Sequence, residues 1–310
     1  MKILVTGGNG YLGSKISHHL HNIGYDVTSL TRNKIHEKTL EHKIKIINWD
    51  DLNTLLEAVT NIDVVIHTAG MNYQNCEIDP IAALNFNGKS TLDLINASIS
   101  KGVKKFIYLS TIQVYNSRLE GVIDEKSNLM NFHPYATSHV AGESYVINAA
   151  KNNTLDGVVL RLSNVFGKPT TKNIDCWDLL INNLCKQAVE NNKLLLKSDG
   201  FQYRNFLPIT NLCNVIANLL KHKSLNKFNS LINLGSNDSY KVIDITKLVQ
   251  ERYEYMFGLK VNINLDHLNK TYSNDFKFNS IYSFEIDKYK IIEIKDEIDD
   301  LLKYCKYNFS

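Results

Sequence analysis

The stretch KILVTGGNGYLGSKI, residues 2–16, decides the fold. A short apolar run leads into three spaced glycines, and an amphipathic pattern begins directly after them. A strand that passes through such glycines into a helix brings backbone N–H groups and the helix N-terminus together, where a pyrophosphate can bind. A tight turn without a ligand is the alternative. We therefore expect a dinucleotide-binding loop built by Gly7, Gly10, Tyr11, Leu12 and Gly13.

The same alternation of short and long patterns continues outward from this stretch. Five more apolar, β-branched runs are typical of parallel strands buried on both faces, at residues 26–30, 43–47, 63–67, 104–110 and 155–163. Helical patterns separate them, so we predict an α/β protein with a Rossmann-type, doubly wound parallel sheet. After residue 166 the rhythm loosens, and strand runs such as 230–235 are expected in a smaller lobe. The predicted organisation is a dinucleotide-binding domain at 1–165 and a substrate-binding lobe at 166–310, partly interleaved as one structural unit.

Composition excludes several classes of protein. The chain has 310 residues, of which 44% are hydrophobic and 22% charged, and its net charge is +3 without a basic stripe, which argues against nucleic-acid binding. Five scattered cysteines without CxxC spacing favour free thiols over disulfides or a metal site. The chain opens on a strand pattern and contains no apolar run of membrane length. We expect a cytoplasmic protein that binds neither a membrane nor a metal.

The end of the second strand bears on the choice of dinucleotide. NAD-binding proteins usually place an acidic residue there to hold the ribose 2′-hydroxyl. Here Thr31 stands at that position and Arg32 follows it. An arginine suits a 2′-phosphate, so the sequence favours NADP, with NAD possible.

A second informative stretch is FHPYATSHVAGESYVINAA, residues 132–150. It is helical in pattern, and it carries Tyr135 and His139 four positions apart, hence on one face. On spacing alone, packing would explain this pair. The motifs along the rest of the chain favour a catalytic role instead.

Eight segments in order carry a family resemblance: TGGNGYLG, WDDL, VVIHTAG, LNFNGKSTLDLINAS, YLSTIQVYN, YATSHVAGE, LRLSNVFGK and SDGFQYRNFLPITNL. With them the chain resembles the extended short-chain dehydrogenase/reductases, the NAD-dependent epimerase/dehydratase family that acts on nucleotide sugars. The resemblance covers nearly the whole chain and is strongest over residues 1–170. One departure stands out, because His139 occupies the position of the family's lysine.

The resemblance implies roles for individual residues. For the cofactor it adds Asp50 or Asp51, Ala69, Gly70, Asn85, Tyr135 and His139. For catalysis it implies Thr111, Tyr135 and His139, and for a nucleotide-sugar substrate Thr111, Gln113, Asn164 and Arg204. It also implies a homodimer that pairs helices near 81–101 and 135–151, with apolar candidates at Leu92, Ile95, Ile99, Val140, Val146 and Ile147.

The histidine affects which direction of reaction the site suits. In the family a tyrosine exchanges a proton with a sugar hydroxyl while a hydride moves to or from the nicotinamide, and the lysine charge helps the phenol to ionise. A phenol has a pKa of about 10 and an imidazole one of about 6.5, so His139 supplies little charge near neutral pH. Oxidation needs Tyr135 as a base, whereas reduction needs it as an acid, its resting form. Together with Arg32, this predicts NADPH-dependent reduction of a 4-keto group on a nucleotide sugar, in surface-polysaccharide synthesis.

Two alternatives remain open. One is a nucleotide-sugar 4-epimerase, and the other is a catalytically impaired cofactor-binding protein, because of the change at residue 139. Dehydration is disfavoured, because Ile112 and Gln113 follow Thr111 where family dehydratases usually carry an Asp-Glu pair.

Overall fold

The computed structural model describes residues 1–32, 42–266 and 274–310. In this part of the chain two compact units are present. The first contains Met1–Ser117, Ser127–Leu162 and Ile216–Asn233, and the second contains Arg118–Lys126, Ser163–Val215 and Leu234–Ser310. The chain therefore crosses between the units several times. A domain boundary at residue 165 stays a prediction.

The first unit is built on a seven-stranded sheet of described residues, with the strand order β11-β7-β5-β4-β1-β2-β3. Its strands are β1 (Lys2–Thr6), β2 (Asp26–Thr31), β3 (Lys43–Ile46), β4 (Val64–His67), β5 (Lys105–Thr111), β7 (Asp156–Leu162) and β11 (Leu231–Leu234). The pairs from β3 through to β7 are parallel. This arrangement confirms the predicted doubly wound α/β fold. The strand order reverses between β1 and β4, the point at which such sheets bind ligands beyond their carboxyl ends.

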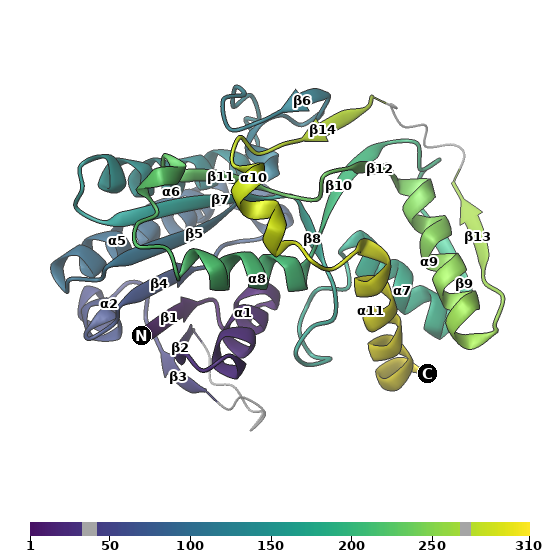
Figure 1. The fold of residues 1–310 in the computed structure, drawn as a ribbon, viewed down its shortest axis with the longest axis horizontal. Helices are drawn as coiled ribbons and strands as arrows, with labels where there is room; N and C mark the ends of the chain where they lie inside the picture. Colours follow the sequence, from purple (N-terminus) through teal and green to yellow (C-terminus); the bar gives the residue numbers. More distant parts are fainter. Residues whose placement is uncertain (33–41, 267–273) are drawn as a thin grey trace. The chain divides into compact units, whose positions relative to one another are not determined.

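Helices cover both faces of this sheet. They are α1 (Tyr11–Asn22), α2 (Leu52–Val59), α3 (Tyr73–Ile78), α4 (Pro80–Ala83), the π-helix η1 (Leu84–Lys89), α5 (Ser90–Ser100) and α6 (Pro134–Lys151), with the short turns η2 (Ile112–Val114) and η3 (Asn226–Phe228). Helices α2, α5 and α6 lie together on one face, while α1 covers the other (Figure 1). The sheet is thus enclosed, which explains its apolar strands.

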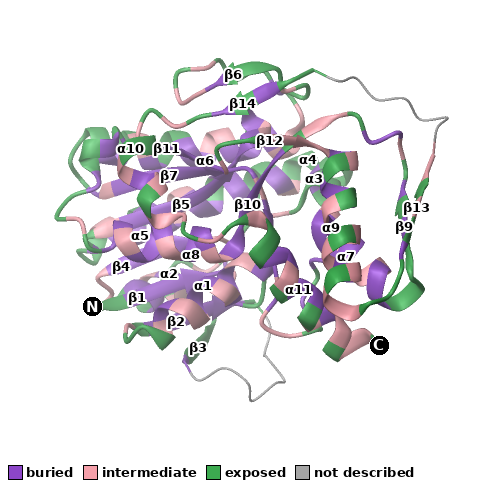
Figure 2. Cartoon of the chain, turned by 45° about the vertical axis from the view of Figure 1, so that its right-hand side comes forward, coloured by how far each residue is buried: buried purple, intermediate pink, exposed green. Residues whose placement is uncertain are grey.

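Burial differs between the centre and the edge of the sheet. Ile3, Leu4 and Val5 of β1 have no exposed surface, whereas all four residues of β3 are exposed (Figure 2). β3 is an edge strand that alternates lysine with isoleucine, and Lys43 pairs with Asp26 of β2 at 3.1 Å. The expectation of a fully buried strand at 43–47 was therefore wrong. Charged side chains on an edge strand hinder pairing with other chains.

The run at 230–235 was expected in the smaller lobe, but it forms β11 at the other edge of the large sheet. The backbone N–H of Val159 donates to the carbonyl of Ser230 at 2.9 Å, which fixes the register beside β7. Ile232 and Leu234 are fully buried. A short apolar run shows that a strand is buried, but not which sheet it joins.

The second unit is made of small sheets and packed helices. Its strands are β6 (Gly121–Ile123), β8 (Asn164–Phe166), β9 (Lys193–Leu196), β10 (Tyr203–Pro208), β12 (Ser239–Lys241), β13 (Asn262–Leu265) and β14 (Phe276–Phe278). Its helices are α7 (Leu180–Asn191), α9 (Val242–Phe257), α10 (Ser283–Ile286), η4 (Asp287–Tyr289) and α11 (Ile294–Phe309), and α8 (Ile209–Leu219) contributes residues to both units. Helices α7, α9 and α11 pack around one hydrophobic core.

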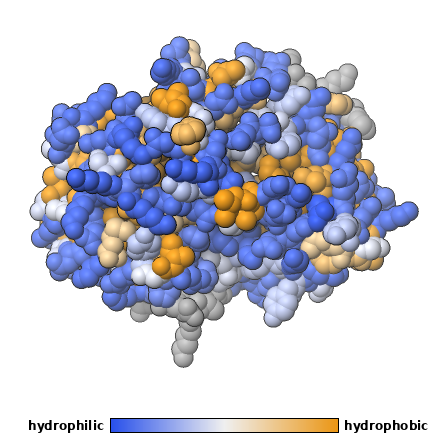
Figure 3. Space-filling view, viewed as in Figure 1, coloured by the Kyte–Doolittle hydropathy of each residue, from blue (hydrophilic) through white to orange (hydrophobic). Residues whose placement is uncertain are grey.

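Among the described residues, no helix combines the length and the apolar character needed to cross a membrane. On the face drawn in Figure 3, hydrophilic residues predominate and hydrophobic residues lie in small separate groups.

Candidate active site

The glycine-rich loop joins β1 to α1 at a point of close backbone approach. Gly7 has a φ of +68°, and a Cβ there would lie 2.8 Å from Thr68 Oγ1. A Cβ at Gly13 would lie 2.3 Å from the Gly7 carbonyl oxygen. Both positions therefore require glycine. The glycines predicted from spacing meet here as expected.

The same loop leaves the start of α1 open to an anion. Gly10 is the N-cap residue, and no side chain caps the helix there. Tyr11, which is buried, and Leu12, which is half-buried, form the first turn. Backbone N–H groups and the helix dipole at such a terminus bind phosphate. The loop therefore fits the pyrophosphate of a dinucleotide.

A cavity of about 620 Å³ in the first unit brings three predicted cofactor residues together, namely Arg32, Asp50 and Asn85. The Arg32 guanidinium lies 5.2 Å from the centre of the Phe86 ring, which also lines the cavity. This cation–π contact holds an exposed arginine at the end of β2. The cavity offers both an aromatic face and a positive charge.

The neighbouring predicted residues lie differently. Thr31 is buried at the end of β2. Asp51 caps α2, because its Oδ1 accepts the Asn53 N–H at 2.9 Å. Of the two aspartates that the resemblance left open, Asp50 therefore faces the cavity and Asp51 has a structural role.

The predicted catalytic residues meet at the ends of β5 and β4. Tyr135 and His139 lie on one face of α6, with their ring centres 4.6 Å apart in an edge-to-face arrangement. Thr111 ends β5 beside the Tyr135 phenol, whose pKa its hydroxyl lowers. The His139 ring lies beside Gly70, the residue at the end of the β4 loop, where a Cβ would be 3.6 Å from His139 Cε1. Thr111, Tyr135 and His139 thus lie in one cluster, and their catalytic role stays a prediction.

Burial sets the protonation states in this cluster. Burial raises the pKa of Tyr135 to about 12, although the hydrogen bond from Thr111 opposes this shift. Burial lowers the pKa of His139 to about 4. Desolvation disfavours the charged form of each group. At neutral pH the site therefore holds a protonated phenol beside a neutral imidazole.

Two residues outside the predicted site, Asn131 and His133, hold this cluster in place. Asn131 donates to the Gln113 carbonyl at 2.7 Å and accepts the His133 N–H at 3.0 Å. His133 in turn caps α6, because its Nδ1 accepts the Tyr135 N–H at 3.1 Å. The segment after Thr111 is thereby fastened to the start of the helix that carries Tyr135. A polar pair just before a proline-initiated helix was the available signal.

A buried hydrogen-bond network centred on Asn87 holds the chain directly after Ala69 and Gly70. Asn87 accepts the Met71 N–H at 2.8 Å and donates to Ser138 Oγ at 3.0 Å. Asn87 belongs to the π-helix η1, whereas the predicted Asn85 is exposed two residues earlier. A π-helix shifts which residues face inward, and no pattern in the sequence predicts it here.

The remaining predicted substrate residues are Gln113, Asn164 and Arg204. Gln113 is half-buried in the first unit, and its N–H donates to Thr111 Oγ1 at 3.1 Å. Asn164 and Arg204 belong to the second unit. Asn164 on β8 donates to the Asn205 carbonyl at 2.8 Å, while Arg204 on β10 is exposed and has no ion-pair partner among the residues described.

The fold and the cluster define a Rossmann protein with a tyrosine-based site beside a dinucleotide loop. The chain belongs to the NAD dependent epimerase/dehydratase family, whose model matches residues 3–235. Among curated relatives, human dTDP-D-glucose 4,6-dehydratase is 27% identical over 89% of this chain and 81% of its own length. A putative UDP-glucose 4-epimerase of Methanocaldococcus jannaschii is 26% identical over 80% and 81%.

Solved structures share the fold over the whole chain. UDP-glucose 4-epimerase from Thermotoga maritima, solved with UDP-glucose, has a TM-score of 0.83 at 19% identity and covers 100% of both chains. RMD from Pseudomonas aeruginosa, solved with NADPH, has a TM-score of 0.80 at 19% identity over 99% of both chains. At these identities the likeness establishes the fold alone.

Proposed function

We propose that the protein is an oxidoreductase that uses NADPH to reduce a keto group, most simply the 4-keto group, of a nucleotide-linked sugar. The observation that carries the proposal is the contact between Tyr135 and His139, whose ring centres lie 4.6 Å apart and where His139 stands in the family's lysine position. Tyr135 has a pKa raised to about 12, and its neighbour His139 has one lowered to about 4. A phenol that keeps its proton suits a proton donor, and a proton donor is what reduction requires.

Each residue of the site has a separate role in the proposed reduction. A bound dihydronicotinamide supplies the hydride that reduces the carbonyl carbon. Tyr135 Oη delivers the proton to the carbonyl oxygen and recovers one from solvent. Thr111 hydrogen-bonds the same oxygen, and Gln113 contacts the sugar, while a substrate contact by Asn164 stays a prediction. His139 lies beside Tyr135 but is uncharged, so it does not promote loss of the Tyr135 proton.

Other reactions of the family fit less well. Epimerisation at C4 needs Tyr135 to act first as a base, and in the described residues no cation lowers the pKa of its phenol. It remains the second candidate, supported by the epimerases among the relatives. Ile112 and Gln113 offer no acid–base group for dehydration. A cofactor-binding protein without turnover is the third candidate.

A substrate panel distinguishes these functions. Purified protein is incubated with NADPH and a series of nucleotide 4-ketosugars, and NADPH consumption and products are followed. Stoichiometric consumption with an alcohol product supports the reductase. Interconversion of 4-hydroxy epimers without net consumption indicates the epimerase. Tight dinucleotide binding without any turnover indicates the binding protein.

Arg32 should set the choice of dinucleotide. Because the guanidinium can pair with a 2′-phosphate, Arg32→Ala should weaken NADPH binding by about tenfold to a hundredfold and change NADH binding little. Titration of both dinucleotides by fluorescence measures this difference. Lys45→Ala, which removes an exposed charge on neighbouring β3, is the control. Equal affinity of the unaltered protein for NADPH and NADH would contradict the assignment.

Arg204 should anchor the diphosphate of the substrate by a charge-assisted contact. Arg204→Ala is expected to raise KM for the nucleotide sugar by about tenfold and to leave dinucleotide affinity unchanged. Steady-state kinetics on the sugar identified by the panel provides the measurement. An unchanged KM would show that Arg204 does not contact the substrate.

We also propose a homodimer. Of the six apolar candidates on the expected helices, Ile95 and Val146 are buried in the core, and Ile99 and Ile147 pack against it. The exposed apolar residues here are instead Ile81 on α4, 75% exposed, and Leu84 at the start of η1, 55% exposed. Light scattering at micromolar concentration should give a dimer mass, and Ile81→Glu should shift it towards the monomer. A monomeric mass for the unaltered protein would refute the proposal.

A further inference from the structure

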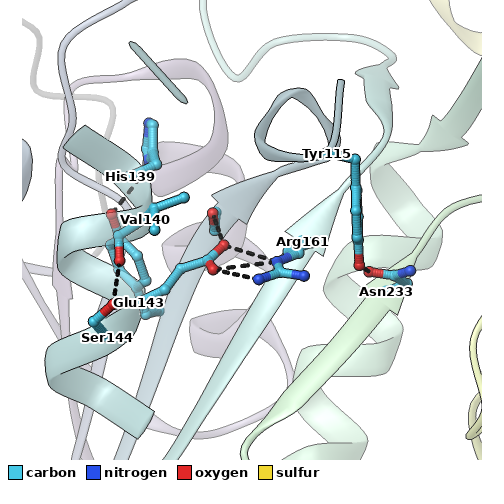
Figure 4. Close-up of polar contacts among 9 residues, drawn as sticks. Tyr115, His139, Val140, Glu143, Ser144, Arg161 and Asn233 are labelled. Carbon is cyan, nitrogen blue, oxygen red and sulfur yellow. Dashed lines mark hydrogen bonds and ion pairs between the residues drawn. The ribbon is translucent and has the colours of Figure 1, made fainter. Parts of the chain in front are cut away.

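Tyr108 on β5 makes a buried polar contact with His139. Its Oη lies 3.0 Å from His139 Nδ1, and the side chains are 1% and 6% exposed. Gly142 makes the contact possible, because a Cβ there would lie 2.7 Å from Tyr108 Oη. The strand residue and the helix residue are therefore held together inside the first unit (Figure 4 shows His139 on α6).

One hydrogen atom lies between Tyr108 Oη and His139 Nδ1, and it is bonded to one of these two atoms. Burial, followed by the charge of Glu143, raises the pKa of Tyr108 well above its usual value, so this phenol keeps its proton. His139 is neutral and carries one ring hydrogen. The contact therefore has two possible states: either Tyr108 donates to Nδ1, or Nδ1–H donates to Tyr108.

The neighbouring hydroxyl of Thr91 donates no hydrogen to Tyr108, so the choice depends on which group accepts from Tyr108. Thr91 Oγ1 donates its own proton to the Asn87 carbonyl at 2.7 Å. The same oxygen is 2.9 Å from His67 Nε2, which must then be the donor to it. A hydroxyl oxygen accepts two hydrogen bonds, so Thr91 Oγ1 retains one acceptor position beside Tyr108. The imidazole nitrogen of His139 is the stronger acceptor and receives the hydrogen bond from Tyr108.

The other side of the His139 ring is open to the site. Nε2 lies 3.9 Å from the position of a Cβ at Gly70, and no described residue accepts or donates a hydrogen bond there. We propose that Tyr108 is a positioning residue that holds His139 in the tautomer with hydrogen on Nε2. The neutral ring then presents a fixed N–H donor at the carboxyl end of β4, where a dinucleotide would lie.

The tautomer of His139 is inferred from its contacts alone. Its role in orienting the cofactor rests on the proposed function. A histidine without a permanent charge can still orient a cofactor, provided that its one hydrogen is on the correct nitrogen. Tyr108 supplies that condition by occupying Nδ1. The site thereby has a directed donor without the positive charge that would promote loss of the Tyr135 proton.

Nitrogen NMR of the full-length, ¹⁵N-labelled protein tests the proposal independently of turnover. The chain has 10 histidines, and the His139 signals are assigned by their loss in His139→Gln. The unaltered protein should show one Nε2–H tautomer that stays constant across neutral pH. An Nδ1–H tautomer in the unaltered protein would overturn the proposal, whatever the enzyme does.

Tyr108→Phe and Tyr115→Phe make a matched pair of variants. Both remove one buried phenol oxygen from the first unit, but Tyr115 Oη bonds Asn233 at 2.6 Å and is not part of the site. Tyr108→Phe should give mixed His139 tautomers and weaken dinucleotide binding by about tenfold. Tyr115→Phe should leave both unchanged. A pure Nε2–H tautomer in Tyr108→Phe would contradict the positioning role, and if that variant does not fold, the tautomer of the unaltered protein decides.

Discussion

Tyr135→Phe should lower kcat for ketosugar reduction by about 100- to 10,000-fold, because it removes the phenol that we propose as the proton donor to the substrate oxygen. Thr111 can still hydrogen-bond that oxygen, so a residual rate is expected. Dinucleotide affinity should change little. Steady-state rates and a separate binding titration measure the two effects.

The control for this variant lies on the same helix. Tyr145 of α6 is partly exposed and has no role in the site, so Tyr145→Phe should keep full activity. A fall in kcat of less than about threefold in Tyr135→Phe would mean that another group donates the proton. In that case the assignment of the site would fail, although the fold would stand.

Glu143→Ala should destabilise the first unit by about 3–5 kcal/mol, because it leaves a buried guanidinium without its partner. Glu143 on α6 accepts from Arg161 Nη2 at 2.6 Å and from Ser110 Oγ at 2.5 Å, which ties the helix to β7 and β5 (Figure 4). Both charged residues are buried. Burial alone would lower the pKa of Arg161, but the Glu143 carboxylate raises it above its usual value. Urea unfolding measures the loss.

An exposed ion pair in the same unit gives the comparison. Lys104 and Asp63 are 2.7 Å apart, but the lysine side chain is largely exposed to solvent. Lys104→Ala should therefore cost less than about 1 kcal/mol. Similar losses of unfolding free energy in Lys104→Ala and Glu143→Ala would contradict the claim that burial makes the Glu143–Arg161 pair the more stabilising of the two.

The sequence predicts those parts of the site that depend on local spacing. The glycines at 7, 10 and 13 follow one strand and start one helix, so their meeting is a local property. Tyr135 and His139 share a face because one helix carries both. The residues that close each sheet strand, such as Thr111, meet because parallel strands end at one edge.

The contacts that tune the site are not local, and the sequence did not reveal them. Tyr108 reaches His139 from a strand 31 positions away, and only the missing Cβ of Gly142 lets it approach. A hydroxyl within the apolar run of β5 was the one available sign. Asn87 is turned inward by a π-helix, and β11 joins the large sheet by tertiary packing, so neither follows from periodicity.

The pH dependence of kcat/KM for ketosugar reduction, measured for the unaltered protein and for His139→Lys, tests the central claim most directly. The acid form of Tyr135 is the active form, so activity is retained below its pKa and lost above it. With that pKa at about 12 and His139 neutral above about 4, the unaltered protein should show a plateau across the accessible neutral and mildly alkaline range. The lysine charge should lower the pKa of Tyr135 and bring a falling limb into that range. A falling limb near neutral pH in the unaltered protein, unmoved by His139→Lys, would contradict the account and favour the epimerase.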